Sequence, residues 1–310
     1  MKIDQLQERQ EITFTAQVQL WDAAIDISGM MLAGGVVAHQ GAKLQPDKYK
    51  AYIEFSLAHA YPVVSSFGTS FHASTLKNSF ASMLNQQFNY GHLLREYFKE
   101  EKGRDVREDR ILGAVIAVDF PREPMGGWKI TDYETSPGMH CIATVAKQAK
   151  GMDRVLGQYQ TGRHDWTVSL ELNYTPAESG VVLIPVQQGD LGSRARQDAI
   201  SDEEKALMAK HTPDDYARAG LSYLPILEAP EELMDCFNLD KKIWSKPWKG
   251  HKIVTLAGGI GGNVDFMGTG LVRYGAEPAA RIEQVLAEDK EMAAFADGLT
   301  KLSELLDRIA

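Results

Sequence analysis

The stretch GRHDWTVSLELNY, residues 162–174, alternates apolar and polar side chains at every second position. The apolar set is Trp166, Val168, Leu170, Leu172 and Tyr174, and the polar set is Asp165, Thr167, Ser169, Glu171 and Asn173. A period of two is typical of a β-strand with one buried face. The polar face of such a strand most often contacts water. A serine held beside a carboxylate on a strand can also serve as a nucleophile, so we treat Ser169 and Glu171 as candidate catalytic residues.

Further strands are predicted on both sides of this stretch. ILGAVIAV at 111–118 and GVVLIPV at 180–186 have the length and composition of buried strands. Residues 140–158 predict a strand followed by a helix that is broken near Gly151. The strands do not alternate regularly with helices, as they would in a doubly wound sheet. We therefore expect an α+β fold that is rich in strands.

Three segments are predicted as helices. Residues 46–61 carry apolar and aromatic side chains that crowd one side of a helix, which Pro62 would end. Residues 92–103 show a short apolar stripe and end at a glycine. The C-terminal segment 276–310 is the strongest helix prediction. It contains an apolar seam suited to packing on another helix, formed by Leu299, Leu302, Leu306 and Ile309.

A chain of 310 residues is long enough for one large domain or two ordinary ones. Composition changes at residue 187, where QQGDLGSRARQDAISD is polar and charged. We therefore expect a first domain at 1–186, a polar linker at 187–202 and a C-terminal region at 203–310 that ends in the helix.

Charge and cysteine content argue against several classes of function. The net charge of −9 leaves no basic excess to displace counterions from phosphates, so we do not expect a general nucleic-acid binder. Cys141 and Cys236 are far apart, and no residues have metal-ligand spacing. We therefore expect no disulfide framework, metal or other cofactor. No apolar run approaches the ~20 residues of a membrane helix. These features favour a soluble intracellular protein.

A serine nucleophile needs a neighbouring base, and the chain has 8 histidines. His92, in FNYGHLL, lies near the start of a predicted helix, where the helix dipole disfavours the protonated ring. The neutral imidazole could then accept a proton. His72, in SFHAST, is the alternative base, and His140 and His164 are weaker candidates. A histidine taken alone is more often packed or solvated than catalytic.

Two further motifs have simpler interpretations. AGGIGG at 257–262 lacks the Lys-Ser/Thr of a P-loop and breaks the Gly-x-Gly-x-x-Gly spacing, so we expect a flexible turn. Arg194 and Arg196 could polarise an oxyanion. A solvated linker is the commoner setting for such a pair of arginines.

The segments FNYGHLL, ILGAVIAVDFP and GRHDWTVSLELNY together resemble the prohead (capsid maturation) proteases of tailed bacteriophages. These serine proteases are similar in fold to the herpesvirus assemblins. They carry a histidine in a phrase like vn..H, then an apolar strand, then a serine in a phrase like vSmE. The resemblance covers about residues 10–186, and its matching motifs are Asn89-Tyr90-Gly91-His92 and Val168-Ser169-Leu170-Glu171.

The resemblance implies an assemblin-like barrel flanked by helices, and acyl-transfer chemistry. Ser169 would attack the scissile carbonyl, His92 would act as base and then acid, and Glu171 would orient the ring. Glu178 or Asp190 could replace Glu171 as the third catalytic residue.

The resemblance also implies partners and a location. The substrates would be the scaffold, the major capsid protein's extension and the protease itself, cleaved inside the assembling prohead in the host cytoplasm. The C-terminal region would target the protein into the prohead or mediate self-association through its helix. The alternative is a non-catalytic phage structural or scaffolding protein with a related barrel.

Overall fold

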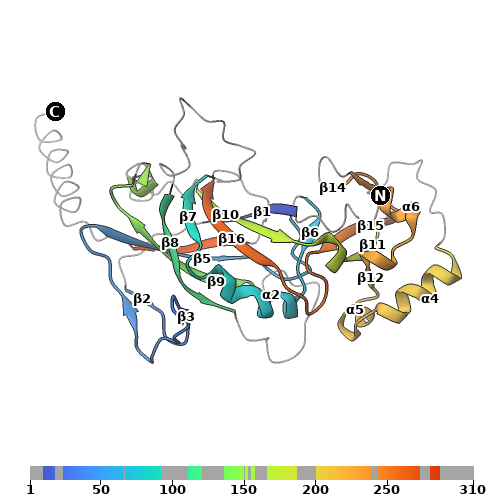
Figure 1. The fold of residues 1–310 in the computed structure, drawn as a ribbon, viewed down its shortest axis with the longest axis horizontal. Helices are drawn as coiled ribbons and strands as arrows, with labels where there is room; N and C mark the ends of the chain where they lie inside the picture. The colour runs from blue at the N-terminus through green and yellow to red at the C-terminus, as the bar shows by residue number, and fades with distance from the viewer. Residues whose placement is uncertain are drawn as a thin grey trace, which may run out of the picture.

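Strands make up most of the regular structure of the protein (Figure 1). The predicted strand-rich α+β class is confirmed. The computed structural model describes residues 10–17, 24–65, 67–91, 111–120, 136–149, 151–152, 155–157, 166–186, 200–238, 243–272 and 280–286.

The larger sheet has nine strands and is curled into a half-barrel. Its strands are β1 (Gln10–Gln17), β3 (Met31–Leu32), β5 (Lys50–Leu57), β7 (Gln87–Tyr90), β8 (Ile111–Asp119), β9 (Met139–Ala146), β10 (Thr167–Tyr174), β16 (Asp265–Val272) and β17 (Ala280–Leu286). Their order is β3-β8-β7-β16-β10-β1-β17-β5-β9, and β8 also pairs with β9. We call the surface that lines the curl the inner face and the opposite surface the outer face.

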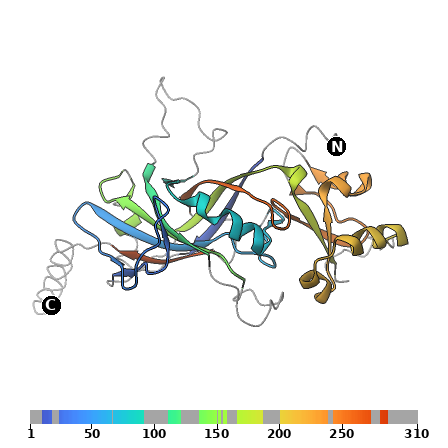
Figure 2. The same cartoon turned by 60° about the horizontal axis from the view of Figure 1, so that its bottom comes forward.

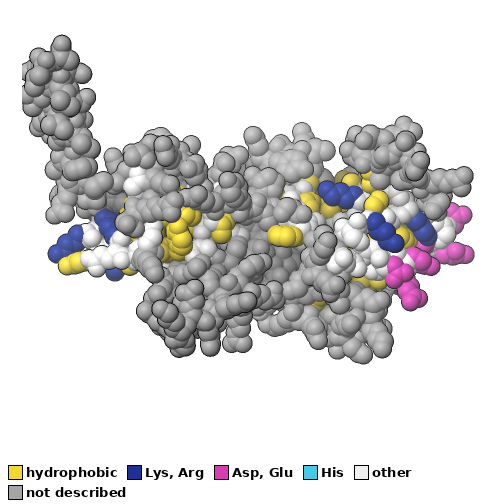
Figure 3. All heavy atoms as spheres, turned by 90° about the horizontal axis from the view of Figure 1, so that it is seen from above, with side chains coloured by type: hydrophobic (Ala, Val, Ile, Leu, Met, Phe, Trp, Pro, Cys, Tyr) yellow, Lys and Arg dark blue, Asp and Glu magenta, His cyan; other side chains and the backbone are white. Residues whose placement is uncertain are grey.

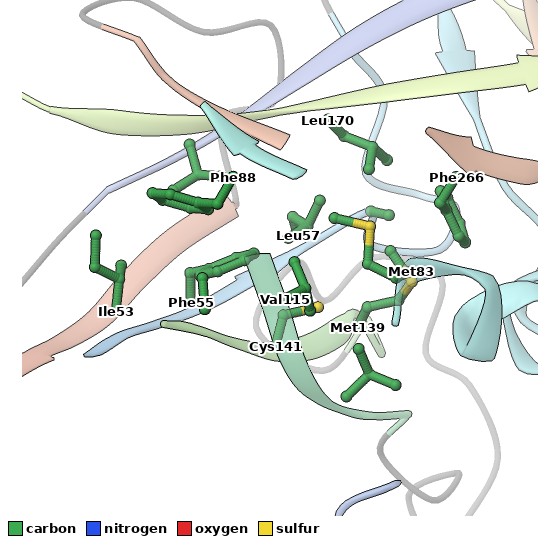
Figure 4. Packing of buried hydrophobic residues seen from close by; sticks show 14 of the residues in the cluster. Ile53, Phe55, Leu57, Met83, Phe88, Val115, Met139, Cys141, Leu170 and Phe266 are labelled. Carbon is green, nitrogen blue, oxygen red and sulfur yellow. The ribbon is translucent and has the colours of Figure 1, made fainter. Parts of the chain in front are cut away.

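Apolar side chains fill the space enclosed by the inner face (Figure 4). Every second residue of β5 is buried there, namely Ala51, Ile53, Phe55 and Leu57. Leu170 of β10 and Phe88 of β7 join the same core, and the rings of Phe55 and Phe88 have centroids 5.6 Å apart. Each large apolar side chain buried in this way contributes about 1.5–3 kcal/mol, so this core is the main source of stability.

Two other segments pack against the curled sheet. Helix α2 (Ala73–Ser79) and the 3₁₀ helix η1 (Phe80–Met83) add Leu76 and Met83 to the core of the inner face. Residues 24–44 form an arm with the short strands β2 (Ile25–Asp26) and β4 (Lys43–Leu44). Apolar residues of the arm pack on Ala117 of β8 and Ile142 of β9. The arm therefore covers part of the outer face.

A second sheet lies at the other end of the molecule (Figures 1 and 2). Its strands, in spatial order, are β12 (Ser222–Pro225), β11 (Gly180–Pro185), β15 (His251–Leu256) and β6 (Thr69–Ser70). The elements around it are η4 (Pro176–Glu178), α4 (Asp202–His211), α5 (Asp214–Arg218), η5 (Ile226–Glu228), α6 (Glu231–Met234), β13 (Phe237–Asn238) and β14 (Ile243–Trp244). Leu183, Leu224, Leu233 and Ile253 are buried in a separate core between this sheet and its helices.

Helix α4 begins at a capping box that the local sequence encodes. The Ser201 hydroxyl accepts from the backbone N–H of Glu204, and the Glu204 carboxylate accepts from the N–H of Ser201. Lys249 pairs with the same carboxylate. Burial opposes the charged form of Glu204, but the bonds from Lys249 and Ser201 outweigh it and hold the pKa of Glu204 below its usual value.

Acidic side chains gather at the end of the molecule that carries the second sheet (Figure 3). Exposed acids occupy the first turns of two helices there, Asp202 and Glu203 in α4 and Glu231 and Glu232 in α6. Carboxylates at these positions lie near the positive end of the helix dipole, which stabilises them. This placement gives part of the net negative charge a local structural role.

Several predicted strands are confirmed. Strands β8, β10 and β11 lie in the segments predicted at 111–118, 162–174 and 180–186, and the strand predicted from residue 140 corresponds to β9. The helix predicted at 46–61 is wrong, because residues 50–57 form β5. The start of the helix predicted at 276–310 is also wrong, because 280–286 form β17. The seam from Leu299 to Ile309 and the helix predicted at 92–103 lie outside the described residues.

Both sheets combine strands from before and after the predicted linker at 187–202. In the curled sheet β10 pairs with β16, and in the second sheet β11 pairs with β15. Of the linker itself the structure describes residues 200–202, which lead into α4. The division into a first domain at 1–186 and a C-terminal region at 203–310 stays a prediction.

Candidate functional site

Ser169 and Glu171 lie on the outer face of β10, between β1 and β16. The expectation that this polar face is solvated is wrong, because Ser169 is 1% exposed and Glu171 is 5% exposed. The position of the strand at Ser169 is fixed from the inner face, where the Thr269 hydroxyl donates to the Ser169 carbonyl at 2.8 Å. Ser169 therefore stands on a hydrogen-bonded central strand, on the same face as a buried carboxylate.

Two glycines of β16 lie next to these residues in the sheet. Ser169 is paired with Gly270, and Gly270 is paired with Asn89 of β7. Glu171 is paired with Gly268, and Gly268 is paired with Gln87. Directly paired residues point to the same face of a sheet. Strand β16 lies between β10 and β7. At these two paired positions it therefore places no side chain on the outer face.

The side chains of Glu171 and Asn89 approach each other across Gly268. A Cβ built on Gly268 would lie 3.5 Å from Oε2 of Glu171 and 3.7 Å from Nδ2 of Asn89. Asn89 is 1% exposed, and its Oδ1 has no hydrogen-bond partner. The structure thus adds Asn89 to the two residues of β10. The sequence carried a signal for Asn89, because it begins the histidine motif, but no chemical role could be assigned to it there.

His92, the candidate base, lies outside the described residues. The residue before it, Gly91, is described. The N–H of Gly91 donates to the carbonyl of Leu271 at 2.8 Å, and its φ of 79° lies in the left-handed region. The Gly91 carbonyl occupies the place that a Cβ on Gly270 would take. The chain therefore bends at Gly91, and the Gly91 carbonyl lies on the face that carries Ser169.

His72, the alternative base, is the N-cap of α2. Its Nδ1 lies 2.5 Å from the Ser74 hydroxyl and accepts from the Ser74 backbone N–H at 3.2 Å. The ring also packs on Tyr216, with centroids 5.7 Å apart. These contacts give His72 a structural role at the start of a helix. Its role as the alternative base stays a prediction.

The remaining candidate residues are dispersed. His140 of β9 lies with Nε2 2.7 Å from Oε1 of Glu54 on β5. Glu178 is exposed in η4, after the end of β10. His164 and Asp190, as well as Arg194 and Arg196, lie outside the described residues. Glu171 is therefore the candidate carboxylate that the described structure places beside Ser169.

The glycine-rich segment 257–262 forms a turn, as predicted, and it packs against α2. Thr75 donates to the carbonyl of Gly259 at 2.7 Å, and the Asn78 side chain donates to the carbonyl of Gly261 at 2.8 Å. Gly258, Gly259 and Gly261 all have positive φ. Glycine is needed in this turn for its backbone conformation.

In the described part of the chain, no three His, Cys, Asp or Glu side chains form a group that could hold a metal ion. Cys141 and Cys236 are buried, and neither forms a disulfide. Burial raises the pKa of the Cys236 thiol. None of the described helices is long and apolar enough to span a membrane.

No protein-family model matches the chain, and searches of curated proteins and of solved structures found no match either. The candidate site therefore depends on the geometry around Ser169 and on the resemblance of the histidine and serine motifs.

Proposed function

We propose that this protein is a serine endopeptidase that matures the prohead of a tailed bacteriophage. It would cleave the scaffold, the extension of the major capsid protein and itself inside the assembling shell, in the host cytoplasm, without a cofactor. The motifs around His92 and Ser169 support this proposal. The curled sheet, with its β8–β9 pairing, is compatible with the assemblin-like barrel that the resemblance implies.

The turn at Gly91 is the observation on which the proposal depends most. The Gly91 carbonyl lies over Gly270, and Gly270 is the direct partner of Ser169. His92 is the next residue in the chain. A serine nucleophile requires a base within hydrogen-bond reach of its hydroxyl. A histidine that follows Gly91 in the chain fits this requirement, because the Gly91 backbone lies next to the strand position paired with Ser169.

The proposed chemistry assigns one role to each residue. Ser169 Oγ attacks the scissile carbonyl carbon while His92 takes the hydroxyl proton. The C–N bond then breaks, and the leaving amine receives that proton from His92. Water hydrolyses the acyl-enzyme with His92 again acting as base, which regenerates Ser169. Glu171, on the face of Ser169 and buried beside it, holds the imidazole in the useful tautomer.

The alternative function is that of a non-catalytic structural or scaffolding protein with a related barrel. One observation favours it, namely the 1% exposure of Ser169. A peptide substrate could reach the hydroxyl only after the residues that cover it move. A structural protein would need no such movement.

Purified wild-type protein, Ser169→Ala and Ser56→Ala should each be incubated with the scaffold and capsid proteins encoded beside it. Ser56 lies on the outer face of β5 and is the matched control. We expect wild type and Ser56→Ala to cleave, and Ser169→Ala to be inactive. Equal cleavage by wild type and Ser169→Ala, or no cleavage by any of the three, would favour the structural alternative.

The base is tested in the same assay with His92→Ala and His72→Ala. We expect His92→Ala to abolish cleavage and His72→Ala to retain it, provided both variants remain folded by circular dichroism. The opposite result would assign the base to His72.

Self-cleavage is expected in the polar segment 187–202, because a protease needs locally unfolded chain as its substrate. Mass spectrometry of the products formed by wild type, with Ser169→Ala as control, would map the new termini. Cuts confined to residues 60–170 would contradict this expectation. The predicted C-terminal helix, with its seam from Leu299 to Ile309, would target the protein into the prohead or mediate self-association.

A further inference from the structure

The amide of Asn89 is an unusual feature of the outer face of the curled sheet. Asn89 is 1% exposed on β7, and its Oδ1 accepts no hydrogen bond. Native proteins pair nearly all buried polar atoms, since an unpaired one lowers stability. An apolar residue of the same shape would avoid this cost. Packing alone therefore does not explain an asparagine at this position.

Gly268 lies beside Asn89 and leaves a small space that is surrounded by polar atoms. The place of its absent Cβ is 3.3 Å from the Gln87 carbonyl oxygen, 3.5 Å from Oε2 of Glu171 and 3.7 Å from Nδ2 of Asn89. These are two acceptors and one donor. A space with two to four polar neighbours is suited to a bound water molecule.

We propose that Asn89 is a positioning residue of the Ser169 site, which fixes the Glu171 carboxylate through a polar contact made over Gly268. This inference rests on the proposed function, because a fixed carboxylate matters only if Glu171 orients a catalytic imidazole. In this proposal the amide N–H of Asn89 donates to a water molecule in the space over Gly268, and that water donates to the Glu171 carboxylate. Gly268 is a glycine because a side chain would displace that contact.

The same geometry gives Glu171 a hydrogen-bond donor on the β16 side. A buried carboxylate needs hydrogen-bond donors around it. The neighbouring side of β16 supplies none from its side chains, because both Gly268 and Gly270 lack them. Asn89, one strand further away, has the donor nearest to Gly268 on that side. The Asn89 amide therefore offers Glu171 a hydrogen-bond donor that no β16 side chain at these positions can supply.

Two substitutions test this role from different directions. Asn89→Leu keeps the branched shape and removes the polar atoms, whereas Gly268→Ala puts a methyl group into the shared space at ordinary contact distance from both side chains. We expect each to lower kcat for scaffold cleavage by about 10- to 100-fold, with KM within twofold, because the catalytic groups are misplaced while substrate binding is unchanged. The Tm of Asn89→Leu should equal or exceed that of the wild type. Asn238→Leu, which makes the same change at a half-buried position of β13, is the control and should keep its kcat.

The outcomes separate this inference from the proposed function. If Ser169→Ala cleaves like the wild type, the proposed function fails and this inference fails with it. If Ser169→Ala is inactive while Asn89→Leu and Gly268→Ala keep their full kcat, only the positioning role is overturned. It is also overturned if Asn89→Leu loses activity with a lowered Tm while Gly268→Ala remains fully active, because Asn89 would then act through packing.

Discussion

Strands β5 and β10 have the same alternating pattern, yet their polar faces have different environments. On β5, Glu54 and Ser56 are half-buried at the outer face, and Glu54 pairs with His140. On β10, Ser169 and Glu171 are buried, beside two glycines of the neighbouring strand. The inner faces of both strands pack into one apolar core. The comparison shows that alternation identifies the inner face but not the environment of the outer face.

The largest expected difference between the two strands is in catalysis. Glu171→Gln removes the charge that would orient the imidazole, so we expect cleavage to fall by roughly 10²- to 10⁴-fold. Glu54→Gln makes the same change on β5 and should leave the rate within about twofold, since Glu54 has no role in the proposed reaction. Initial rates on the scaffold protein measure both. Equal losses in the two variants would remove the functional distinction between the strands.

Truncation of a core side chain should lower stability to a similar extent on β5 and β10, because the inner faces of the two strands pack into the same core. Phe55→Ala on β5 and Leu170→Ala on β10 should each lower the free energy of unfolding by about 2–5 kcal/mol through the cavity they leave. Urea unfolding in the Ser169→Ala background, which avoids self-cleavage, measures this change. Leu227→Ala, at a side chain 57% exposed, is the control and should change it by less than about 0.5 kcal/mol. A tolerated Leu170→Ala would contradict the shared core.

Substitution of a glycine of β16 beside β10 should lower stability by a smaller amount. Gly270→Ala would place its Cβ on the Gly91 carbonyl, so backbone must shift, and we expect a loss of about 1–3 kcal/mol. The control is Gly157→Ala, because a Cβ there has no atom within 4 Å. Thermal unfolding of the two variants should separate them clearly. Identical Tm values would mean that Gly91 does not pack closely on β16.

The smallest effect lies outside both strands and serves as a baseline. Ser201→Ala removes the cap of α4 and should lower the free energy of unfolding by about 1 kcal/mol, with no effect on cleavage.

The pKa of Glu204 is lower in the folded protein than the usual 4.5, so its contribution to stability is complete above that pH and is lost as pH falls through the folded pKa. Unfolding measured from pH 6 to pH 3 should show this loss in the wild type and less of it in Glu204→Gln. An unchanged pH dependence in Glu204→Gln would show that the capping box has no such role.

The confirmed strand predictions share a local cause. β8 and β11 are short apolar runs, and β10 alternates without interruption, so neighbouring residues alone specify them. The helix prediction for 46–61 failed because of Tyr52. This aromatic residue is half-buried on the outer face of β5 and interrupts the apolar–polar alternation of the strand. The apolar residues of the segment then also fitted one side of a helix. The pairing with β9 and β17 is what makes this segment a strand.

The candidate site was predictable in part. The alternation at 162–174 selected Ser169 and Glu171 as two side chains of one face, since adjacent odd positions of a strand must share a face. The role of Asn89 was not predictable, because it depends on the register of β7, β16 and β10. These three strands are far apart in the chain, and nothing local encodes their alignment.

The sequence by itself determined which residues of this protein form strands with an apolar face, because a period of two is a property of neighbouring side chains. It also determined that a serine and a carboxylate share one face of β10. Only the tertiary structure decided that this face is buried and that Asn89 lies across Gly268 from Glu171. The physical reason is that burial and contact depend on what other segments pack there, and strand pairing sets that over long sequence separations.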